Sequence, residues 1–262
     1  MRDYFPARPT GSPLLWIHGG AFAGGDIDMP ESNVVAHRLA ASGRRVRTLQ
    51  YRLAPDFSGE TPLVLGAAPG RYPAAQDDVL AAFTDLAAAG PAFLGGASAG
   101  ACIAAGSAIR MRDEGGLIPT GLAFVYGVFH SRLPAHSDAE GQYLTTVTDA
   151  TARRWMTRMM LNYVGVEALL ANPQAIPGEG NPSGLSPVLV LDAEHDVLRA
   201  SGKRFAQQLR TALVPTDERV VAGSEHGFLN DPSSPYFGQG MTILQGWLDQ
   251  TDHGNAPLSV PD

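Results

Sequence analysis

The sequence predicts a single α/β domain with a mostly parallel central sheet and helices on both faces. Apolar runs alternate with segments of helical periodicity along most of the chain, which is the pattern of consecutive strand and helix units. Several runs are continuously apolar, as strands are when helices cover both faces of a parallel sheet. The chain has 262 residues, of which 44% are hydrophobic and 17% charged, enough for one sizeable core. We therefore expect residues 1–262 to form one domain.

The first half of the chain contains strand-like runs separated by helix-like segments. The runs lie at residues 3–5, 13–17, 46–51 and 93–94. Between the second and third runs, Ser32 precedes apolar residues at helical spacing, and Gly43 is a stop signal. Pro73 opens a second helix with one apolar face. Residues 56–72 are rich in Gly and Pro and show no period, so we expect a loop there.

The second half begins with a small-residue helix, and the alternation is then interrupted. We expect a helix over residues 99–112 and a strand over 122–126. From 130 to 186 the rhythm breaks, with a helix inside 145–163 and a Pro/Gly-rich stretch after it, which indicates an insertion over the sheet. The alternation resumes with a strand at 188–191, a helix at 200–212, a strand at 218–221 and a helix at 241–248. Residues 252–262 are expected to be a flexible tail.

Composition excludes several classes of function. The net charge is −7 and the basic residues are scattered, which argues against nucleic acid and anionic membranes as partners. No apolar run approaches the ~20 residues of a membrane-spanning helix, and residues 1–11 lack the apolar core of a signal peptide. We therefore expect a cytoplasmic protein. Cys102 is the only cysteine, which excludes intrachain disulfides, and Lys203 is the only lysine, which disfavours a Schiff-base mechanism.

A serine stands among small residues where an apolar run meets a helix-forming segment. Gly96, Ser98 and Gly100 follow the pattern Gly-x-Ser-x-Gly, in which the serine occupies a sharp turn between a strand and a helix. Positions 96 and 100 must then carry small residues, because the strand and the helix approach each other closely at this turn. Small residues are common in this chain, however, and a tight turn without chemistry explains the pattern equally well. The rest of the sequence has to decide between the two.

A serine hydroxyl needs a histidine base, and usually a carboxylate that orients the histidine, to act as a nucleophile. The candidates here are Ser98, Asp196 directly after a strand, and His226 in the loop after the last strand. All three fall at strand ends, where parallel sheets build their sites. Asp192 and Glu194 lie close to Asp196 in the sequence, so they remain alternatives for the acid.

One further histidine is placed at a strand end. His18 precedes two glycines, where exposed backbone N–H groups could meet a developing oxyanion. The other histidines are interpreted as surface or helix residues: His37, His130, His136, His195 and His253. No pair of histidines has zinc-ligand spacing, so we expect no metal and no cofactor.

Six motifs in chain order carry a resemblance to a known family. They are His18-Gly19-Gly20-Ala21-Phe22, Tyr51-Arg52-Leu53-Ala54-Pro55-Asp56, Pro73-Ala74-Ala75 with Asp78, Ser98-Ala99-Gly100, Ala193-Glu194-His195-Asp196-Val197-Leu198-Arg199, and His226-Gly227-Phe228. Over about residues 2–248 the chain resembles the hormone-sensitive-lipase-like branch of the α/β-hydrolase esterases. This resemblance implies an α/β-hydrolase fold, with residues 130–186 as a cap-like insertion after the sixth strand.

The resemblance also implies roles for individual residues. It selects Asp196 as the acid of the triad, because Asp196 matches the aspartate of the family's Asp-Pro-Leu-Arg segment. It implies an oxyanion hole made by the backbone N–H groups of Gly20, Ala21 and Ala99, with Gly19 as a further candidate. His18 then has a structural role in bracing the loop.

The chain departs from the family pattern in three places. Ala21 replaces the third glycine of the oxyanion motif, and its methyl group could shift the loop. Ala97 and Ala101 stand where the family commonly has Asp and Gly, which removes a hydrogen bond near the nucleophile. Only about a dozen residues precede the motif's strand, where the family usually has a cap segment and an extra strand. We therefore expect the site to be more open than in the family, or to be covered by residues 56–72, by the insertion, or by a second copy in a homodimer.

The predicted function is a serine carboxylesterase that cleaves short or medium acyl esters of small-molecule substrates through an acyl-enzyme. Trp155 and the methionines of the insertion are either ordinary helix packing or the adaptable lining of an acyl pocket. The same triad would serve a lactonase, a formamidase or amidase, or an acyltransferase. A non-catalytic small-molecule receptor is the alternative from another class, and the presence of His226 argues against it.

Overall fold

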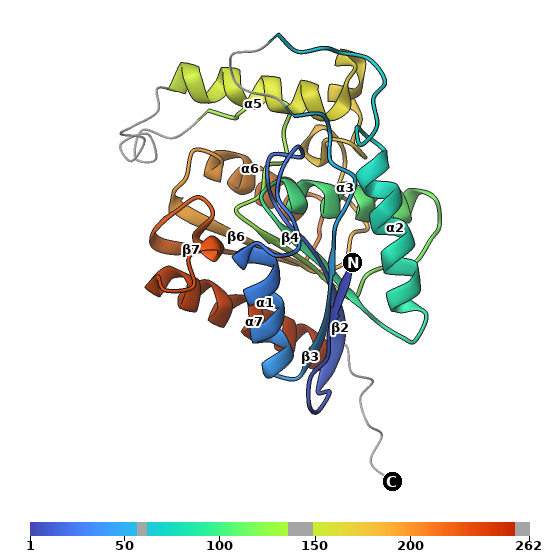
Figure 1. Ribbon diagram of the computed structural model, residues 1–262, viewed down its shortest axis with the longest axis vertical. Helices are drawn as coiled ribbons and strands as arrows, with labels where there is room; N and C mark the ends of the chain where they lie inside the picture. The colour runs from blue at the N-terminus through green and yellow to red at the C-terminus, as the bar shows by residue number, and fades with distance from the viewer. Residues whose placement is uncertain (57–61, 136–148, 255–262) are drawn as a thin grey trace.

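The computed structural model describes residues 1–56, 62–135 and 149–254. They form a seven-stranded sheet in the order β1-β3-β2-β4-β5-β6-β7 (Figure 1). β1 is antiparallel to β3, and every other neighbouring pair is parallel. The strands are β1 (Arg2–Tyr4), β2 (Gly11–Ile17), β3 (Arg44–Leu49), β4 (Phe93–Ala97), β5 (Leu122–Val125), β6 (Val188–His195) and β7 (Thr216–Glu225). The predicted mostly parallel sheet is confirmed.

Helices cover both faces of this sheet. α1 (Pro30–Ala41) and α7 (Pro235–Gly254) pack on one face. The opposite face carries α2 (Ala74–Ala87), α3 (Ala99–Asp113) and α6 (Arg199–Thr211). The described elements also include three short 3-10 turns: η1 (Glu167–Ala171), η2 (Pro177–Glu179) and η3 (Phe228–Asn230). The helices therefore leave the carboxyl ends of the strands as the edge at which a site can form.

The continuously apolar strands are explained by the two cores that they separate. Leu15 and Ile17 of β2 belong to the core under α2 and α3. Leu14 and Trp16 of the same strand belong to the core under α1 and α7. Successive side chains of a strand point to opposite faces, so a strand buried on both sides has no polar face to show.

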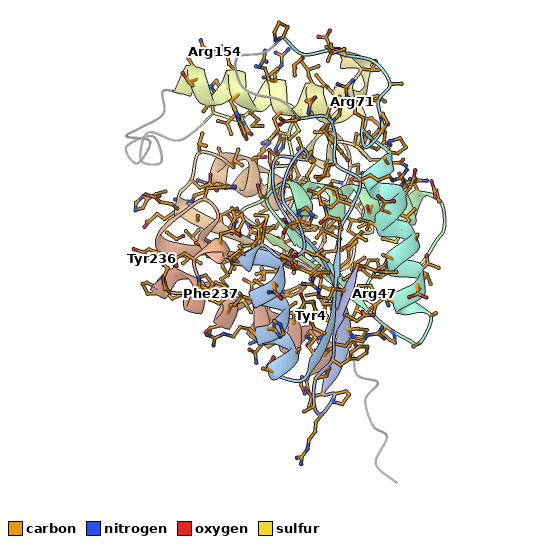
Figure 2. All side chains as sticks on the ribbon, in the orientation of Figure 1. Tyr4, Arg47, Arg71, Arg154, Tyr236 and Phe237 are labelled. Carbon is orange, nitrogen blue, oxygen red and sulfur yellow. The ribbon has the colours of Figure 1, made fainter. Side chains whose placement is uncertain are left out.

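The edge strand β1 is fixed by a buried arginine of its neighbour. Arg47 of β3 is 5% exposed, and its Nε donates to Asp3 of β1 at 2.9 Å. The same guanidinium reaches Asp85 of α2. Figure 2 shows Arg47 beside the N-terminal strand, with Tyr4 nearby. These charge-assisted bonds tie a three-residue strand to the helix layer.

Two sequence predictions about element ends need correction. Ser32 does not precede its helix but lies buried inside α1, which begins at Pro30 after Met29; proline is favoured there because the first helical N–H has no intrahelical partner. The predicted flexible tail begins too early, because residues 252–254 form the end of α7. Asp252 is held there by Arg44 at 2.8 Å. Residues 255–262 lie outside the described residues.

The segment after β5 contains α5 (Asp149–Val164). This helix lies across the top of the molecule, beyond the carboxyl ends of the strands (Figure 1). Its Tyr163 stacks on Phe22 with ring centroids 4.1 Å apart. The insertion predicted to come after the sixth strand follows the fifth strand of this chain, because residues 1–10 form only one strand, β1.

The loop expected at residues 56–72 packs against α5 where it is described. The N–H of Tyr72 donates to the carbonyl of Tyr163 at 3.0 Å, and that of Gly66 donates to the carbonyl of Gly165 at 2.8 Å. Arg71, labelled close to α5 in Figure 2, reaches Asn162 at 3.4 Å. Residues 57–61 and 136–148 lie outside the described residues. Within the described ranges, no helix is long and apolar enough to span a bilayer.

Candidate active site

Ser98 occupies a strained turn between β4 and α3. Its backbone has φ 53° and ψ −119°, a combination that non-glycine residues rarely adopt. The N–H of Ser98 is held by the carbonyl of Val125 on the neighbouring strand at 2.9 Å. Strain of this kind persists only where the surrounding structure over-determines it. The Gly-x-Ser-x-Gly pattern therefore has the strained backbone geometry that a nucleophile elbow requires.

The two flanking glycines are required by close backbone contacts. A Cβ on Gly100 would lie 2.2 Å from the carbonyl oxygen of Ile17. A Cβ on Gly96 would lie 2.6 Å from the carbonyl carbon of Gly100. Both neighbours are backbone atoms, so neither contact is relieved by a side-chain rotation.

Gly100→Ala is expected to destabilise the protein by about 3 kcal/mol or more, because overpacking against backbone forces the strand and helix apart. Urea unfolding measures this change. Gly246→Ala in α7 is the matched control, because a Cβ there meets nothing within 4 Å and alanine favours a helix by about 1 kcal/mol over glycine. Equal stability of the two variants would contradict the role assigned to Gly100.

Three predicted residues from three loops form one hydrogen-bonded chain. Ser98 Oγ lies 3.0 Å from His226 Nε2, and His226 Nδ1 lies 2.6 Å from Asp196 Oδ2. Asp196 is buried, and its Oδ1 accepts the backbone N–H of Leu198 at 2.8 Å. With the Nδ1 proton donated to Asp196, the lone pair of Nε2 faces the serine hydroxyl. This is the arrangement of a nucleophile, its base and the group that orients the base.

The charge of Asp196 governs the protonation of His226. Burial of the imidazole lowers the pKa of His226, but the negative charge and hydrogen bond of Asp196, with a smaller contribution from Glu31, outweigh burial and raise this pKa above its ordinary value. The protonated form of His226 is therefore stabilised by its surroundings.

The two alternative candidates for the acid, Asp192 and Glu194, do not contact His226. Glu194 accepts the backbone N–H of Gly223 at 2.7 Å. Asp192 lies within β6, is 1% exposed, and has no hydrogen-bond partner for Oδ1 among the described residues. Burial, followed by the nearby charges of Asp196 and Glu218, raises the pKa of Asp192 well above its usual range. Asp196 alone of the three contacts His226.

Asp192→Asn is expected to stabilise the protein by at least about 1 kcal/mol, the value of one pKa unit, because folding then no longer requires a proton to be taken up at this buried position, and the gain should be larger at pH 8 than at pH 5. The folded protein keeps a proton on Asp192 that the unfolded chain releases above a pKa of about 3.9. Stability contributed by this group therefore falls as pH rises toward the folded pKa. Urea unfolding at both pH values measures the difference, and an equal change at both would contradict the assignment.

The loop after β2 presents its backbone toward Ser98. Gly20 has φ 105° and Ala21 has φ 53°, so the methyl group of Ala21 has not prevented the turn that glycine would favour. Ala99 is the first residue of α3, where N–H groups have no partner within the helix. The N–H of Gly19, in contrast, donates to Glu31 Oε1 at 2.6 Å. Gly19 is therefore removed from the candidate donors, and Gly20, Ala21 and Ala99 remain.

Residues 14–230 match a family model described as the alpha/beta hydrolase fold, which is well over half of the chain. The chain belongs to the α/β-hydrolase family.

Relatives of this α/β-hydrolase include esterase LipI of Mycobacterium tuberculosis, 31% identical over 238 residues that cover 86% of this chain and 68% of LipI. Carboxylic ester hydrolase LipN of the same organism is 29% identical and is matched over 60% of its length. The hyperthermophilic esterase from the archaeon Pyrobaculum calidifontis shares the fold with a TM-score of 0.76 and 26% identity, covering 95% of this chain and 80% of that chain. The predicted α/β-hydrolase fold is confirmed, and the relatives named above are esterases.

His18 of the α/β-hydrolase lies behind the loop that presents the donors. It is buried, its Nδ1 lies 2.7 Å from the carbonyl oxygen of Gly19, and its ring stacks on Tyr51 at 4.4 Å. Tyr51 also donates its hydroxyl to the carbonyl oxygen of Gly19 at 3.1 Å. Burial lowers the pKa of His18. These contacts support the bracing role for His18 and give Tyr51 the same role. Tyr51 is part of the Tyr-Arg-Leu-Ala-Pro motif, but the sequence alone could not predict its contact with Gly19.

A pocket of about 420 Å³ opens at Ser98, His226 and Asp196 of the α/β-hydrolase. Ser98 and His226 line it, and α5 contributes Trp155 and Met159 to the lining. The remaining lining residues are Gly20, Ala21, Met29, Glu31, Asp196, Val197, Leu198, Gly227 and Asn230. A mostly apolar cavity with a few convergent polar groups is typical of a small-molecule site.

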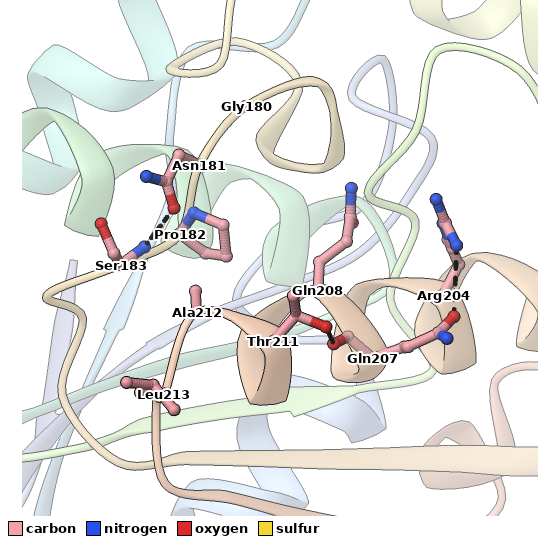
Figure 3. Close-up of a pocket in the computed structure, with 10 residues that line it drawn as sticks. All are labelled: Gly180, Asn181, Pro182, Ser183, Arg204, Gln207, Gln208, Thr211, Ala212 and Leu213. Atoms are coloured by element: carbon pink, nitrogen blue, oxygen red, sulfur yellow. Dashed lines mark hydrogen bonds between the residues drawn. The ribbon is translucent and has the colours of Figure 1, made fainter.

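A larger hollow of about 640 Å³ lies on another face of the α/β-hydrolase. Residues 180–183 and the C-terminal part of α6 line it, with Arg204 bonded to Gln207 at 3.2 Å (Figure 3). It contains no member of the triad, so volume alone does not mark the reactive site. Among the described residues, no cluster of three His, Cys, Asp or Glu side chains is placed to hold a metal, and the absence of a metal or cofactor stays a prediction.

Proposed function

We propose that the protein is a serine carboxylesterase that cleaves short or medium acyl esters through a Ser98–His226–Asp196 triad. The observation that carries the proposal is the continuous chain of contacts, 3.0 Å from Ser98 Oγ to His226 Nε2 and 2.6 Å from His226 Nδ1 to Asp196. The three residues line an apolar pocket. The esterases among its relatives support the reaction class.

In the first half of the reaction, Ser98 Oγ attacks the ester carbonyl carbon while His226 Nε2 takes the hydroxyl proton. The carbonyl oxygen becomes an oxyanion that accepts hydrogen bonds from the backbone N–H groups of Gly20, Ala21 and Ala99. Collapse of this intermediate breaks the bond to the alcohol, which leaves with the proton held by His226. Asp196 stabilises the imidazolium throughout.

In the second half, water attacks the acyl group on Ser98, and His226 takes a proton from that water. The second tetrahedral intermediate collapses, the carboxylic acid leaves, and the proton returns to Ser98 Oγ. The same donors serve both intermediates, because the oxyanion forms at the same place each time.

The pocket supports a compact apolar substrate. A volume of about 420 Å³ suits a small ester, and Met159 and Trp155 provide apolar walls from α5. Methionine adapts to irregular shapes, which is consistent with activity on several acyl lengths.

Hydrolysis of aryl esters with acyl chains of increasing length tests the reaction class. Lactones, N-formyl amines and ester plus acceptor alcohol are run in parallel, because a lactonase, an amidase and an acyltransferase would use the same triad. A strong preference for amides over esters would replace the carboxylesterase assignment. A serine-directed phosphonate separates all of these from a non-catalytic receptor, because only an activated Ser98 is labelled.

A further inference from the structure

Glu31 is a buried carboxylate beside the triad that the mechanism above does not use. It lies in the first turn of α1 and is 2% exposed. Oε1 accepts the backbone N–H of Gly19 at 2.6 Å. Oε2 accepts the hydroxyl of Tyr126 at 2.8 Å and the side-chain amide of Asn230 at 3.0 Å. These three donors come from the loops after three different strands.

The charge of Glu31 is not neutralised by a basic side chain. Among the described residues, no Arg or Lys forms an ion pair with it. Burying a carboxylate is costly unless hydrogen bonds replace its water, and here three donors do so. Such a complete set of partners is what keeps an acidic group stable in an interior.

One end of this network fixes the oxyanion loop. A Cβ on Gly19 would lie 2.7 Å from Glu31 Oε1 and 3.0 Å from Ser98 Cβ, so the Gly19 backbone is held between the two side chains. The bond from the Gly19 N–H to Glu31 orients the His18–Gly19 peptide. The next two peptides along the chain carry the N–H groups of Gly20 and Ala21. Losing that bond would release the donors from their fixed direction, and oxyanion stabilisation depends on fixed donors.

The other end reaches the loop that carries His226. Asn230 lies in η3, and its own N–H donates to the carbonyl oxygen of Gly227 at 2.8 Å, which closes the turn after His226. Tyr126 places its ring edge against the imidazole, with centroids 5.0 Å apart. Both partners of Oε2 therefore contact the segment or the ring that must stay aligned with Ser98.

The charges that act on His226 come from two elements. Asp196, after β6, supplies the larger attraction, and Glu31, on α1, adds to it, and together they raise the pKa of His226 against the effect of burial. Tyr126, after β5, and Ser98, in the elbow, also face the ring but are uncharged. Burial followed by the charge of Glu31 raises the pKa of Tyr126 well above its usual range, so its hydroxyl remains a donor.

We propose that Glu31 is a positioning residue for hydrolysis: it locks the oxyanion loop to the His226 loop, and its charge stabilises the imidazolium formed during acyl transfer. The inference rests on the proposed function. It has two separable parts, because the hydrogen bonds set the geometry and the charge sets the proton affinity of the base.

Two substitutions separate these parts. Glu31→Gln keeps the reach of the side chain but removes the charge and one acceptor, so we expect kcat to fall about tenfold, less than the ~10²-fold loss of a whole oxyanion donor. The acid limb of kcat/KM against pH should move to lower pH, because His226 then loses its proton more easily. Glu31→Asp keeps the charge but shortens the reach, so kcat falls while the acid limb stays in place.

Glu179→Gln is the matched control. Glu179 also accepts a backbone N–H and a hydroxyl, both from Ser131, at 2.9 and 2.7 Å, but it does not line the pocket at the triad. This variant should keep the wild-type kcat and acid limb. Thermal unfolding of every variant shows that the comparison concerns folded protein.

The outcomes are distinct. If the wild-type protein hydrolyses no ester, the proposed function fails, and Glu31 is not at issue. If the wild type is active and folded Glu31→Gln keeps both kcat and the acid limb, the inference is overturned. If Glu31→Gln does not fold, Asn230→Ala removes a single donor from Oε2 and should lower kcat with the acid limb unchanged; an unchanged kcat there overturns the inference instead.

Discussion

Ser98→Ala is expected to lower kcat for ester hydrolysis by about 10⁴–10⁶-fold, the usual cost of removing a catalytic nucleophile. Alanine is compatible with the small-residue turn, so the fold should be retained. Steady-state kinetics on an aryl ester measure the loss, and mass spectrometry after phosphonate treatment should show labelling of the wild type only.

The departures beside the elbow serve as controls for that result. Ala97→Ser and Ala101→Gly alter the neighbours of Ser98 without removing its hydroxyl, so both variants should still be labelled by the phosphonate. Ester hydrolysis by Ser98→Ala at the wild-type rate would refute the assignment of the nucleophile.

Asp196→Asn is expected to lower kcat by about 10³–10⁴-fold while leaving the arrangement of the site intact. The amide oxygen can keep the N–H of Leu198, which now bonds Oδ1 at 2.8 Å, so the amide nitrogen would face His226 Nδ1. That nitrogen donates, which forces Nδ1 to accept and places a proton on Nε2. His226 then has no lone pair for the Ser98 proton. Steady-state kinetics over a range of pH measure both the fall in kcat and the change in the pH dependence of kcat/KM.

Asp192→Asn is the matched control for Asp196→Asn, because it makes the same chemical change within β6, the strand that directly precedes Asp196, without touching His226. Turnover should persist in that variant. Loss of activity in Asp192→Asn together with full activity in Asp196→Asn would transfer the role of the acid to Asp192.

The sequence contained enough to predict the triad because its members mark strand ends. Apolar runs locate the strands, and the residue types at their carboxyl ends follow the order serine, acid, histidine. The choice among Asp192, Glu194 and Asp196 needed the family motif, because all three lie at or beside the end of β6. Only the structure shows that Asp196 alone turns toward His226.

The role of Glu31 was not predictable in the same way. An acidic residue after Pro30 reads as a solvated first turn of a helix, and nothing local in the sequence signals that it is buried. Its partners Gly19, Tyr126 and Asn230 lie 12, 95 and 199 residues away. The same network also explains why Gly19 was retained as an oxyanion donor from the sequence, since its engaged N–H is visible only in three dimensions.

The position of His226 after the last strand has a consequence for folding. Among the described strands, β7 pairs with β6 alone, at the edge of the sheet, and Ser98 and His226 are 128 residues apart in the chain. Contacts of such long sequence separation form late, because the entropy of closing the intervening chain must be overcome first. The proposed reactivity of Ser98 therefore requires the completed sheet, because a chain with β2 to β5 assembled but β7 undocked would have Ser98 in its turn without His226 beside it.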